Sequence, residues 1–146
     1  MWIDLEQGRD AATMRVTLER DPLAPALARA AVAGFSREWE LGPDSLETLA
    51  LLVSELVSNA VVHSDAPAKS DIHLCARVLG RDAIRIEVTD EGSGFAAIRR
   101  DPTGVEGGYG LFLIDSQATS WGIDRRFGNC VWFEVAERPS AGSDSA

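Results

Sequence analysis

The sequence of 146 residues holds little cysteine, little positive charge and no long apolar run. Its two cysteines, Cys75 and Cys130, stand far apart and form no Cys-x-x-Cys pair. This spacing argues against a zinc site and a redox pair, and both residues are expected to be small buried hydrophobes. No apolar run approaches the ~18–20 residues of a membrane helix, and the N-terminus lacks the basic and apolar regions of a signal peptide. We therefore expect a cytoplasmic protein without a membrane partner.

Acidic residues outnumber basic residues in this sequence. Fourteen lysines and arginines stand against 23 acidic residues, which gives a formal net charge of −9 and a sequence pI of about 4.6. A protein that binds nucleic acid needs a basic face, so this balance predicts no direct nucleic-acid partner. An anionic ligand would have to be met by backbone N–H groups, a few arginines or a metal ion.

The length suits one domain, predicted over residues 1–137, with a disordered polar tail at 138–146. Hydrophobic patterning predicts strands at 14–18, 71–78, 84–88, 121–123 and 131–135, while the first ten residues show no clear period. Helices are predicted from about residue 21 to about Trp39, from Asp44 to His63, and over 111–117. This order is typical of an α+β fold with helices on one face of a mostly antiparallel sheet.

The second predicted helix has two different faces. Asp44 and Glu47 have the spacing of a capping box at its start. One broad apolar stripe follows, made of Leu46, Leu49, Ala50, Val53, Leu56, Val57 and Ala60.

The opposite face of that helix mixes polar and apolar residues. Glu55 and Asn59 lie one turn apart on it, together with Leu51 and Val62. A carboxylate and an amide set among apolar residues suit a lined pocket, although the segment alone favours a surface Glu and an Asn near a helix end.

Two glycine-rich segments follow between residues 90 and 110, which are predicted to form a long loop. In Asp90-x-Gly92-x-Gly94 the glycines allow the backbone to approach a ligand, and the carboxylate can accept a hydrogen bond from an exocyclic amine. Gly107-Gly108-Tyr109-Gly110 leads directly into the helix at 111–117, whose free N–H groups would suit a phosphate. Taken singly, the first segment also fits a turn and the second a flexible entry loop.

Several common nucleotide and hydrolase motifs are missing. The chain contains no Walker A sequence and no Gly-x-Ser-x-Gly elbow, and its glycines do not form the Rossmann turn between a first strand and helix.

The order and spacing of the three polar segments resemble the N, G1 and G2 boxes of the GHKL (Bergerat-fold) ATPases. The matching residues are Glu55-Leu-Val-Ser-Asn59, Asp90-x-Gly92-x-Gly94 and Gly108-x-Gly110. The closing Gly128-Asn-Cys-Val-Trp-Phe-Glu134 is similar to the last hairpin of one branch, the anti-sigma-factor serine/threonine kinases (RsbW/SpoIIAB-like). The resemblance covers about residues 12–136 and implies a two-layer Bergerat sandwich.

The resemblance implies a site for ATP and Mg²⁺. Asn59 would coordinate Mg²⁺, and Glu55 would be the general base that activates the acceptor hydroxyl. Asp90 would bind the adenine amine, and residues 95–107 would form a lid. The other nucleotide-binding residues implied are Gly92, Gly94, Gly108, Tyr109, Gly110 and Leu111.

The resemblance also implies partners and a reaction. Relatives bind a sigma factor and phosphorylate a serine of a STAS-type anti-anti-sigma factor, usually as homodimers, and the helix carrying Arg29 and Arg37 is a candidate partner surface. The alternative is a nucleotide-gated binding module with weak or no kinase activity. Family members often have Thr at the position of Cys130, where it supports the adenine-binding Asp, so Cys130 is expected to alter adenine affinity.

Overall fold

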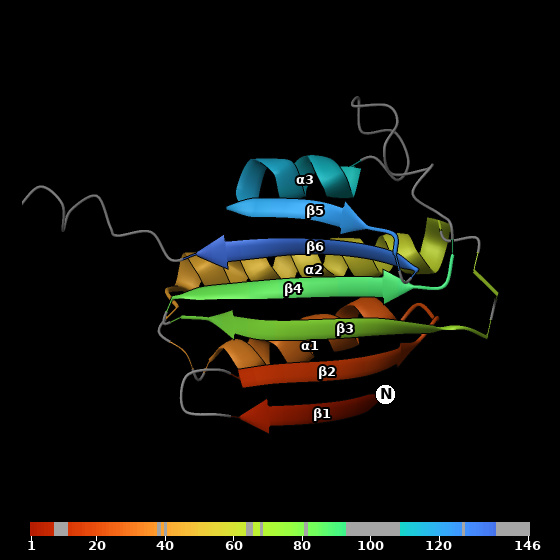
Figure 1. The fold of residues 1–146 in the computed structure, drawn as a ribbon, viewed down its shortest axis with the longest axis horizontal. Coiled ribbons are helices and arrows are strands. Elements are labelled where there is room, and N and C mark those ends of the chain that lie inside the picture. Colours follow the sequence, from red (N-terminus) through yellow and green to blue (C-terminus); the bar gives the residue numbers. More distant parts are fainter. Residues whose placement is uncertain are drawn as a thin grey trace, which may run out of the picture.

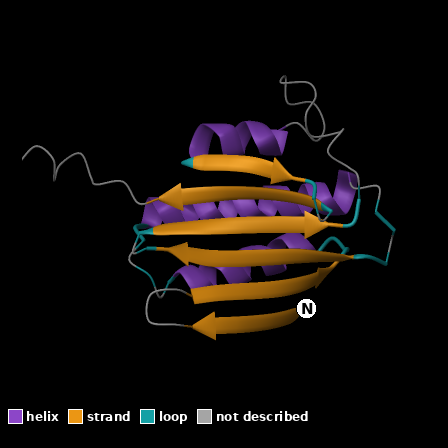
Figure 2. Cartoon of the chain, in the orientation of Figure 1, coloured by secondary structure: helices purple, strands orange, loops and turns teal. Residues whose placement is uncertain are grey.

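The computed structural model describes residues 1–7, 12–37, 39, 41–63, 66–67, 69–80, 82–92, 109–126 and 128–136. These residues form one antiparallel sheet with helices behind it (Figure 1). Figure 2 shows the near face of the sheet without a described helix over it. The α+β class and the placement of the helices on one face are thereby confirmed. The tail predicted at 138–146 and the lid predicted at 95–107 lie outside the described residues.

The sheet has the strand order β1-β2-β3-β4-β6-β5 over the described residues. Its strands are β1 (Trp2–Gln7), β2 (Ala12–Glu19), β3 (Asp71–Leu79), β4 (Ala83–Asp90), β5 (Ser120–Asp124) and β6 (Asn129–Ala136). β1 was not predicted. It is an edge strand that pairs only with β2 among these strands, and its Trp2, Ile3 and Leu5 side chains are exposed. A strand with so little burial leaves a weak hydrophobic signal in the sequence.

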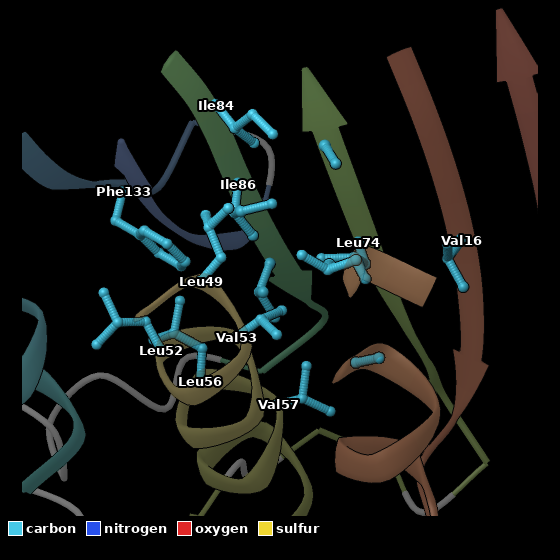
Figure 3. Close-up of a cluster of buried hydrophobic side chains, with 14 of the residues drawn as sticks. Val16, Leu49, Leu52, Val53, Leu56, Val57, Leu74, Ile84, Ile86 and Phe133 are labelled. Carbon is cyan, nitrogen blue, oxygen red and sulfur yellow. The ribbon is translucent and has the colours of Figure 1, made fainter. Parts of the chain in front are cut away.

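Alternation along the inner strands decides which side chains enter the core. In β2, β3, β4 and β6 every second residue is buried, as the period-two pattern predicts. These side chains meet the apolar stripe of the helix α2 (Pro43–His63), as Figure 3 shows for Leu49 and Val53 near Ile86. Each such side chain stabilises the fold by roughly 1.5–3 kcal/mol when fully buried.

The predicted stripe on α2 is largely confirmed. Leu49, Val53, Leu56, Val57 and Ala60 are buried, while Leu46 and Ala50 are half-buried. Leu52, which the prediction omitted, is also fully buried and belongs to the same face. On the opposite face Leu51 and Val62 are exposed.

Three helix ends differ from their predictions. The helix α1 (Ala24–Ser36) ends before Trp39. α2 begins at Pro43, where the Gly42 carbonyl accepts the Leu46 N–H at 3.1 Å, so Asp44 lies inside the first turn and the predicted capping box is wrong. Proline suits a first helical position because its missing N–H is not needed there.

The third difference is at the helix α3 (Tyr109–Gln117), which begins two residues earlier than predicted. Tyr109 and Gly110 therefore lie in its first turn instead of in the preceding loop. α3 packs against α2 and β5, and its Ile114 side chain is fully buried.

The open face of the sheet carries an aromatic contact between β5 and β6. A Cβ atom added at Gly122 would lie 2.7 Å from the Trp132 ring, so the indole occupies the space that a side chain at 122 would fill. The Arg85 guanidinium lies 4.0 Å from the centre of the Trp132 ring and forms an ion pair with Glu134 at 2.9 Å. The contact joins three neighbouring strands.

α2 is long and apolar enough to cross a membrane when only length and composition are considered, with a mean hydropathy of 1.4 over Pro43–Val62. The sequence analysis predicted this helix but did not count it as long and apolar enough to span a membrane, because Asp44, Glu47 and Glu55 interrupt its apolar runs. In the structure α2 packs along the sheet and supplies core side chains, which is the arrangement of a core helix in a globular domain.

Candidate functional site

Three chain segments that are distant in sequence end at the same side of the molecule. Figure 1 shows the end of β4 at Asp90, the end of α2 at His63 and the start of α3 at Tyr109 on the right-hand side of the view. The described parts of the three predicted boxes that lie at these ends are Asn59, Asp90 with Gly92, and Gly110, and they therefore lie toward the same side of the molecule. Gly94 and Gly108 lie outside the described residues, and only the backbone of Tyr109, Gly110 and Leu111 is described.

On α2 the site is formed by the mixed face predicted from the sequence, which we call the α2 face (Leu51, Glu55, Asn59 and Val62). Glu55 and Asn59 are both half-buried. The side-chain nitrogen Nδ2 of Asn59 is buried and has no hydrogen-bond partner among the described residues. A buried amide without a partner is costly, which is what a residue awaiting a ligand would show.

The end of β4 is a compact cluster of hydrogen bonds, which we call the β4-end cluster (Asp90, Gly92, Gly128 and Asn129). Asp90 is only 8% exposed, and its Oδ1 atom accepts the Gly92 N–H at 2.6 Å. This is the local turn that an aspartate favours when it bonds the backbone two residues ahead. The carboxylate is therefore fixed at the point where β4 ends.

Asn129, the first residue of β6, is a member of this cluster that the sequence reasoning missed. It lies opposite Asp90 in the pairing of β4 with β6 and is 3% exposed. Its Nδ2 atom donates a hydrogen bond to the Gly92 carbonyl. The sequence alone does not state which residue of β4 Asn129 faces.

Gly128 is fixed by two constraints. Its φ of +100° is a conformation that side chains disfavour, and an added Cβ would lie 2.9 Å from the Asp90 carbonyl oxygen. The turn before β6 therefore passes directly against the end of β4, and only glycine allows that approach.

Cys130 lies on the other face of β6 from Asn129. It pairs with Thr89 in the sheet and is half-buried, as is Cys75. The pKa of the Cys130 thiol is raised above its usual value because the thiol is partly buried. A hydrogen bond with the Thr89 side chain offsets part of this rise. The expectation that Cys130 acts on Asp90 is corrected here, because Asn129 is the residue that faces Asp90. The expectation that both cysteines are buried is also corrected, because the open face leaves them partly accessible.

Among the described residues no group of three or more His, Cys, Asp or Glu side chains could hold a metal. Mg²⁺ keeps several waters and is often held by one or two protein oxygens together with the phosphates of a nucleotide. A single amide oxygen from Asn59, whose Nδ2 atom has no partner among the described residues, fits that mode of binding.

Two adjoining cavities lie at the far end of α2, of about 360 and 250 Å³, and both are lined by Asp44, Thr48 and Gln117. They are separate from the β4-end cluster. Another cavity of about 330 Å³ lies beside Arg20 and Ser70, at the connection that follows α2.

Comparison with known proteins decides the family. The family model described as "Histidine kinase-like ATPase domain" matches residues 18–135, which is most of the chain. The chain belongs to the histidine kinase-like (GHKL) ATPase family. The segment matched contains both the α2 face and the β4-end cluster, so the fold and the residues that prompted the resemblance agree with this membership.

Two known proteins resemble this GHKL ATPase domain. It is 33% identical over 73 residues to the anti-sigma F factor of Clostridium acetobutylicum, a match that covers 50% of each chain. The chain thus spans about half the length of this curated relative. It also matches a crystal structure of the RsbU and RsbW domains of a Mycobacterium tuberculosis protein, with a TM-score of 0.63 and 19% identity over 86% of this chain and 31% of that one. At that identity the second match shows the fold alone.

Proposed function

We propose that this GHKL domain is an ATP-dependent serine/threonine kinase that also acts as an anti-sigma factor. The phosphate acceptor would be a serine of a STAS-type anti-anti-sigma factor. The observation that carries the proposal is that the end of β4 with its cluster, the last turns of α2 with Asn59, and the start of α3 lie toward the same side of the molecule (Figure 1). The similarity to an anti-sigma F factor supports the choice of partners.

The β4-end cluster supports recognition of adenine. The Asp90 carboxylate is almost fully buried and is held by the Gly92 N–H, so an exocyclic amine would meet a fixed acceptor there. The absence of side chains at Gly92 and Gly128 lets a flat base approach the backbone. Gly94 is proposed to extend this surface.

The α2 face supports handling of the phosphates. Asn59 would hold Mg²⁺, which when bound neutralises phosphate charge. Glu55 lies one helical turn earlier on the same face and is proposed to accept the proton of the attacking serine hydroxyl. The N–H groups in the first turn of α3, with Gly108, Tyr109, Gly110 and Leu111, are proposed to bind phosphate oxygens, and no acidic residue lies in that turn to oppose them.

The wider biology is proposed from the same branch. The chain would work in the cytoplasm as a homodimer, with a sigma factor as its second partner. Arg29 on α1 is exposed and remains a candidate contact for such a partner.

A variant of the proposed base separates kinase activity from nucleotide binding. We expect wild-type protein with Mg²⁺ and γ-labelled ATP to transfer label to a cognate STAS protein. Glu55→Gln should abolish the transfer while it leaves the affinity for ATP within about twofold, because loss of a general base removes transition-state and not ground-state interactions. Glu47→Gln, an exposed glutamate two helical turns before Glu55 and nearer the other end of α2, should retain the transfer.

The same experiment addresses the alternative, a nucleotide-gated binding module. Wild-type protein that binds Mg·ATP yet labels no STAS protein would contradict the kinase and leave the binding module. Wild-type protein that binds no nucleotide would contradict both.

A further inference from the structure

The connection after α2 contains carbonyl groups that the helix itself does not satisfy. Val61 is two residues from the end of α2 at His63, so no residue of the helix can donate to its carbonyl oxygen in the helical pattern. Ala66 and Pro67 follow in the connection to β3. Their carbonyl groups accept hydrogen bonds from side chains outside α2, and that of Pro67, which is exposed, also accepts the Ser70 N–H.

Arg20, the residue directly after β2, supplies these donors. Its guanidinium donates through Nη1 to the carbonyls of Ala66 at 2.5 Å and Pro67 at 3.0 Å, and through Nη2 to the carbonyl of Val61 at 3.4 Å. The Pro67 oxygen is further tied by Ser70, which donates its N–H at 2.9 Å and its hydroxyl at 2.6 Å. One side chain thus joins the end of β2 to the last turn of α2 and to the following loop.

A cation suits this position for a second reason. The C-terminal end of a helix carries partial negative charge, and a positively charged side chain there is stabilising. The planar guanidinium reaches three carbonyls at once, whereas a lysine ammonium is a single compact group that cannot span the same fork. The position therefore calls for arginine, and its neighbours Glu19 and Asp21 are both acidic.

Asn59 lies two residues before Val61, in the part of α2 that these hydrogen bonds secure. The buried Nδ2 atom of Asn59 has no hydrogen-bond partner among the described residues, so no bond from that atom to them directs the amide. The direction of the amide follows from the backbone of the last turns of α2. A constraint on that backbone is therefore a constraint on Asn59.

We infer that Arg20 is a positioning residue for Asn59: it holds the last turn of α2 so that the Asn59 amide is directed for Mg²⁺ bound with the phosphates of a nucleotide. This inference rests on the proposed ATP and Mg²⁺ site and does not require the kinase reaction. It assigns to Arg20 a role in metal-dependent nucleotide affinity and no contact with the nucleotide.

The test compares ATP affinity with and without metal. The dissociation constant for ATP is measured calorimetrically in Mg²⁺ and in EDTA, for wild type, Arg20→Ala, Arg20→Lys and Asn59→Ala. We expect Arg20→Ala to reduce the gain in ATP affinity from Mg²⁺ by about tenfold. This is the lower end of the losses in metal affinity that follow when a residue that orients a metal ligand is removed. Its affinity in EDTA should remain within about twofold, because Asp90 lies on another element. Arg20→Lys should lose less than Arg20→Ala.

Two controls make the result specific. Arg77→Ala removes an exposed arginine from the open face of the sheet and should leave the gain from Mg²⁺ unchanged. In a background of Asn59→Ala, removal of Arg20 should cause no further loss of the gain, since the two residues act through the same interaction. Hydrogen exchange without nucleotide should be faster in residues 60–63 of Arg20→Ala and unchanged in the central turns of α2.

Each other outcome overturns the inference. An unchanged gain from Mg²⁺ in Arg20→Ala, or an equal fall of affinity in Mg²⁺ and EDTA, would leave Arg20 with a general structural role only. An unchanged rate of hydrogen exchange at residues 60–63 would show that Arg20 does not hold the last turn of α2 in place. Wild-type protein that binds no Mg·ATP would overturn the proposed nucleotide site and the inference with it, whereas a wild type that binds it would confine any failure to Arg20.

Discussion

At the end of β4, the side chains of Asp90 and Asn129 hydrogen-bond the main chain around Gly92, whereas on the α2 face the Asn59 amide nitrogen has no partner among the described residues. The β4-end cluster is therefore complete without a ligand, and the α2 face is not. Substitutions in the first region should lower both stability and binding. Substitutions in the second should lower binding alone, since residues kept for function are often not optimal for stability.

The largest effect is expected from removing the charge of Asp90. Mg·ATP at about 100 times its dissociation constant should stabilise the wild type by roughly 2.7 kcal/mol, which raises its melting temperature by several degrees. Asp90→Asn should lose that rise, because an amide nitrogen replaces an acceptor facing the adenine amine. Thermal unfolding with and without Mg·ATP measures this, and an undiminished rise in the variant would remove Asp90 from the nucleotide site.

Gly128→Ala should disrupt the β4-end cluster, because the backbone of the turn before β6 would have to move. The positive φ and the 2.9 Å approach to the Asp90 carbonyl predict a loss of about 1–3 kcal/mol in the free energy of unfolding. Gly34→Ala is the matched control, because a Cβ atom at this exposed helical glycine meets nothing within 4 Å, and we expect a gain of about 0.5–1 kcal/mol. Denaturant titration gives both values, and equal changes would contradict the close approach.

Asn129→Ala tests the hydrogen bond to the Gly92 carbonyl. Loss of the buried donor leaves that carbonyl without its partner and should destabilise the fold by about 1–3 kcal/mol. Nucleotide affinity should fall as well, because Gly92 and Asp90 are then held less firmly. A variant as stable as the wild type would show that the cluster is not preformed.

Asn59→Ala tests the other region of the comparison, the α2 face. The free energy of unfolding should stay the same or rise by about 0.5 kcal/mol, because alanine has the higher helix propensity and the Asn59 Nδ2 atom has no partner to lose among the described residues. The Mg²⁺-dependent part of ATP affinity should disappear. A destabilisation as large as that of Asn129→Ala would show that the α2 face is as complete as the β4-end cluster.

The smallest effect is expected in the turn that leads to Gly128, where Arg126 forms an ion pair with Asp124 at 2.8 Å. Hydrogen bonds from Arg126 lower the pKa of Asp124 from 3.8 to about 2. A carboxyl with a depressed pKa stabilises the folded state above its unfolded pKa, and that contribution is lost as the pH falls from about 3.8 to about 2. Arg126→Ala should flatten the pH dependence of stability in that window only slightly, since the pair is exposed.

The sequence predicted those helices and strands in which the spacing of the apolar residues matches the spacing of the buried positions. The alternation around Ile86 and Phe133 and the stripe that includes Leu49 and Val53 gave the sheet, the helix and the face that carries Glu55 and Asn59. The edge strand β1 was missed because its apolar side chains are exposed. Residues whose role depends on pairing between distant elements were also missed.

Asn129 and Arg20 are the clearest cases of that second kind. The role of Asn129 depends on its register opposite Asp90, and the role of Arg20 depends on carbonyl groups 41 to 47 residues away in sequence. Neither relation leaves a local pattern. Spacing therefore identified the residues expected to contact the ligand, but not the residues that hold them in place.

The contact between Gly122 and Trp132 has a consequence for how this chain can change over time. Because the indole fills the space of a side chain at 122, any larger residue there requires a smaller one at 132 in the same lineage. Loss of the indole would in turn leave Arg85 without its aromatic neighbour and free position 122 to vary. The two positions, ten residues apart in the sequence, should therefore covary among close relatives.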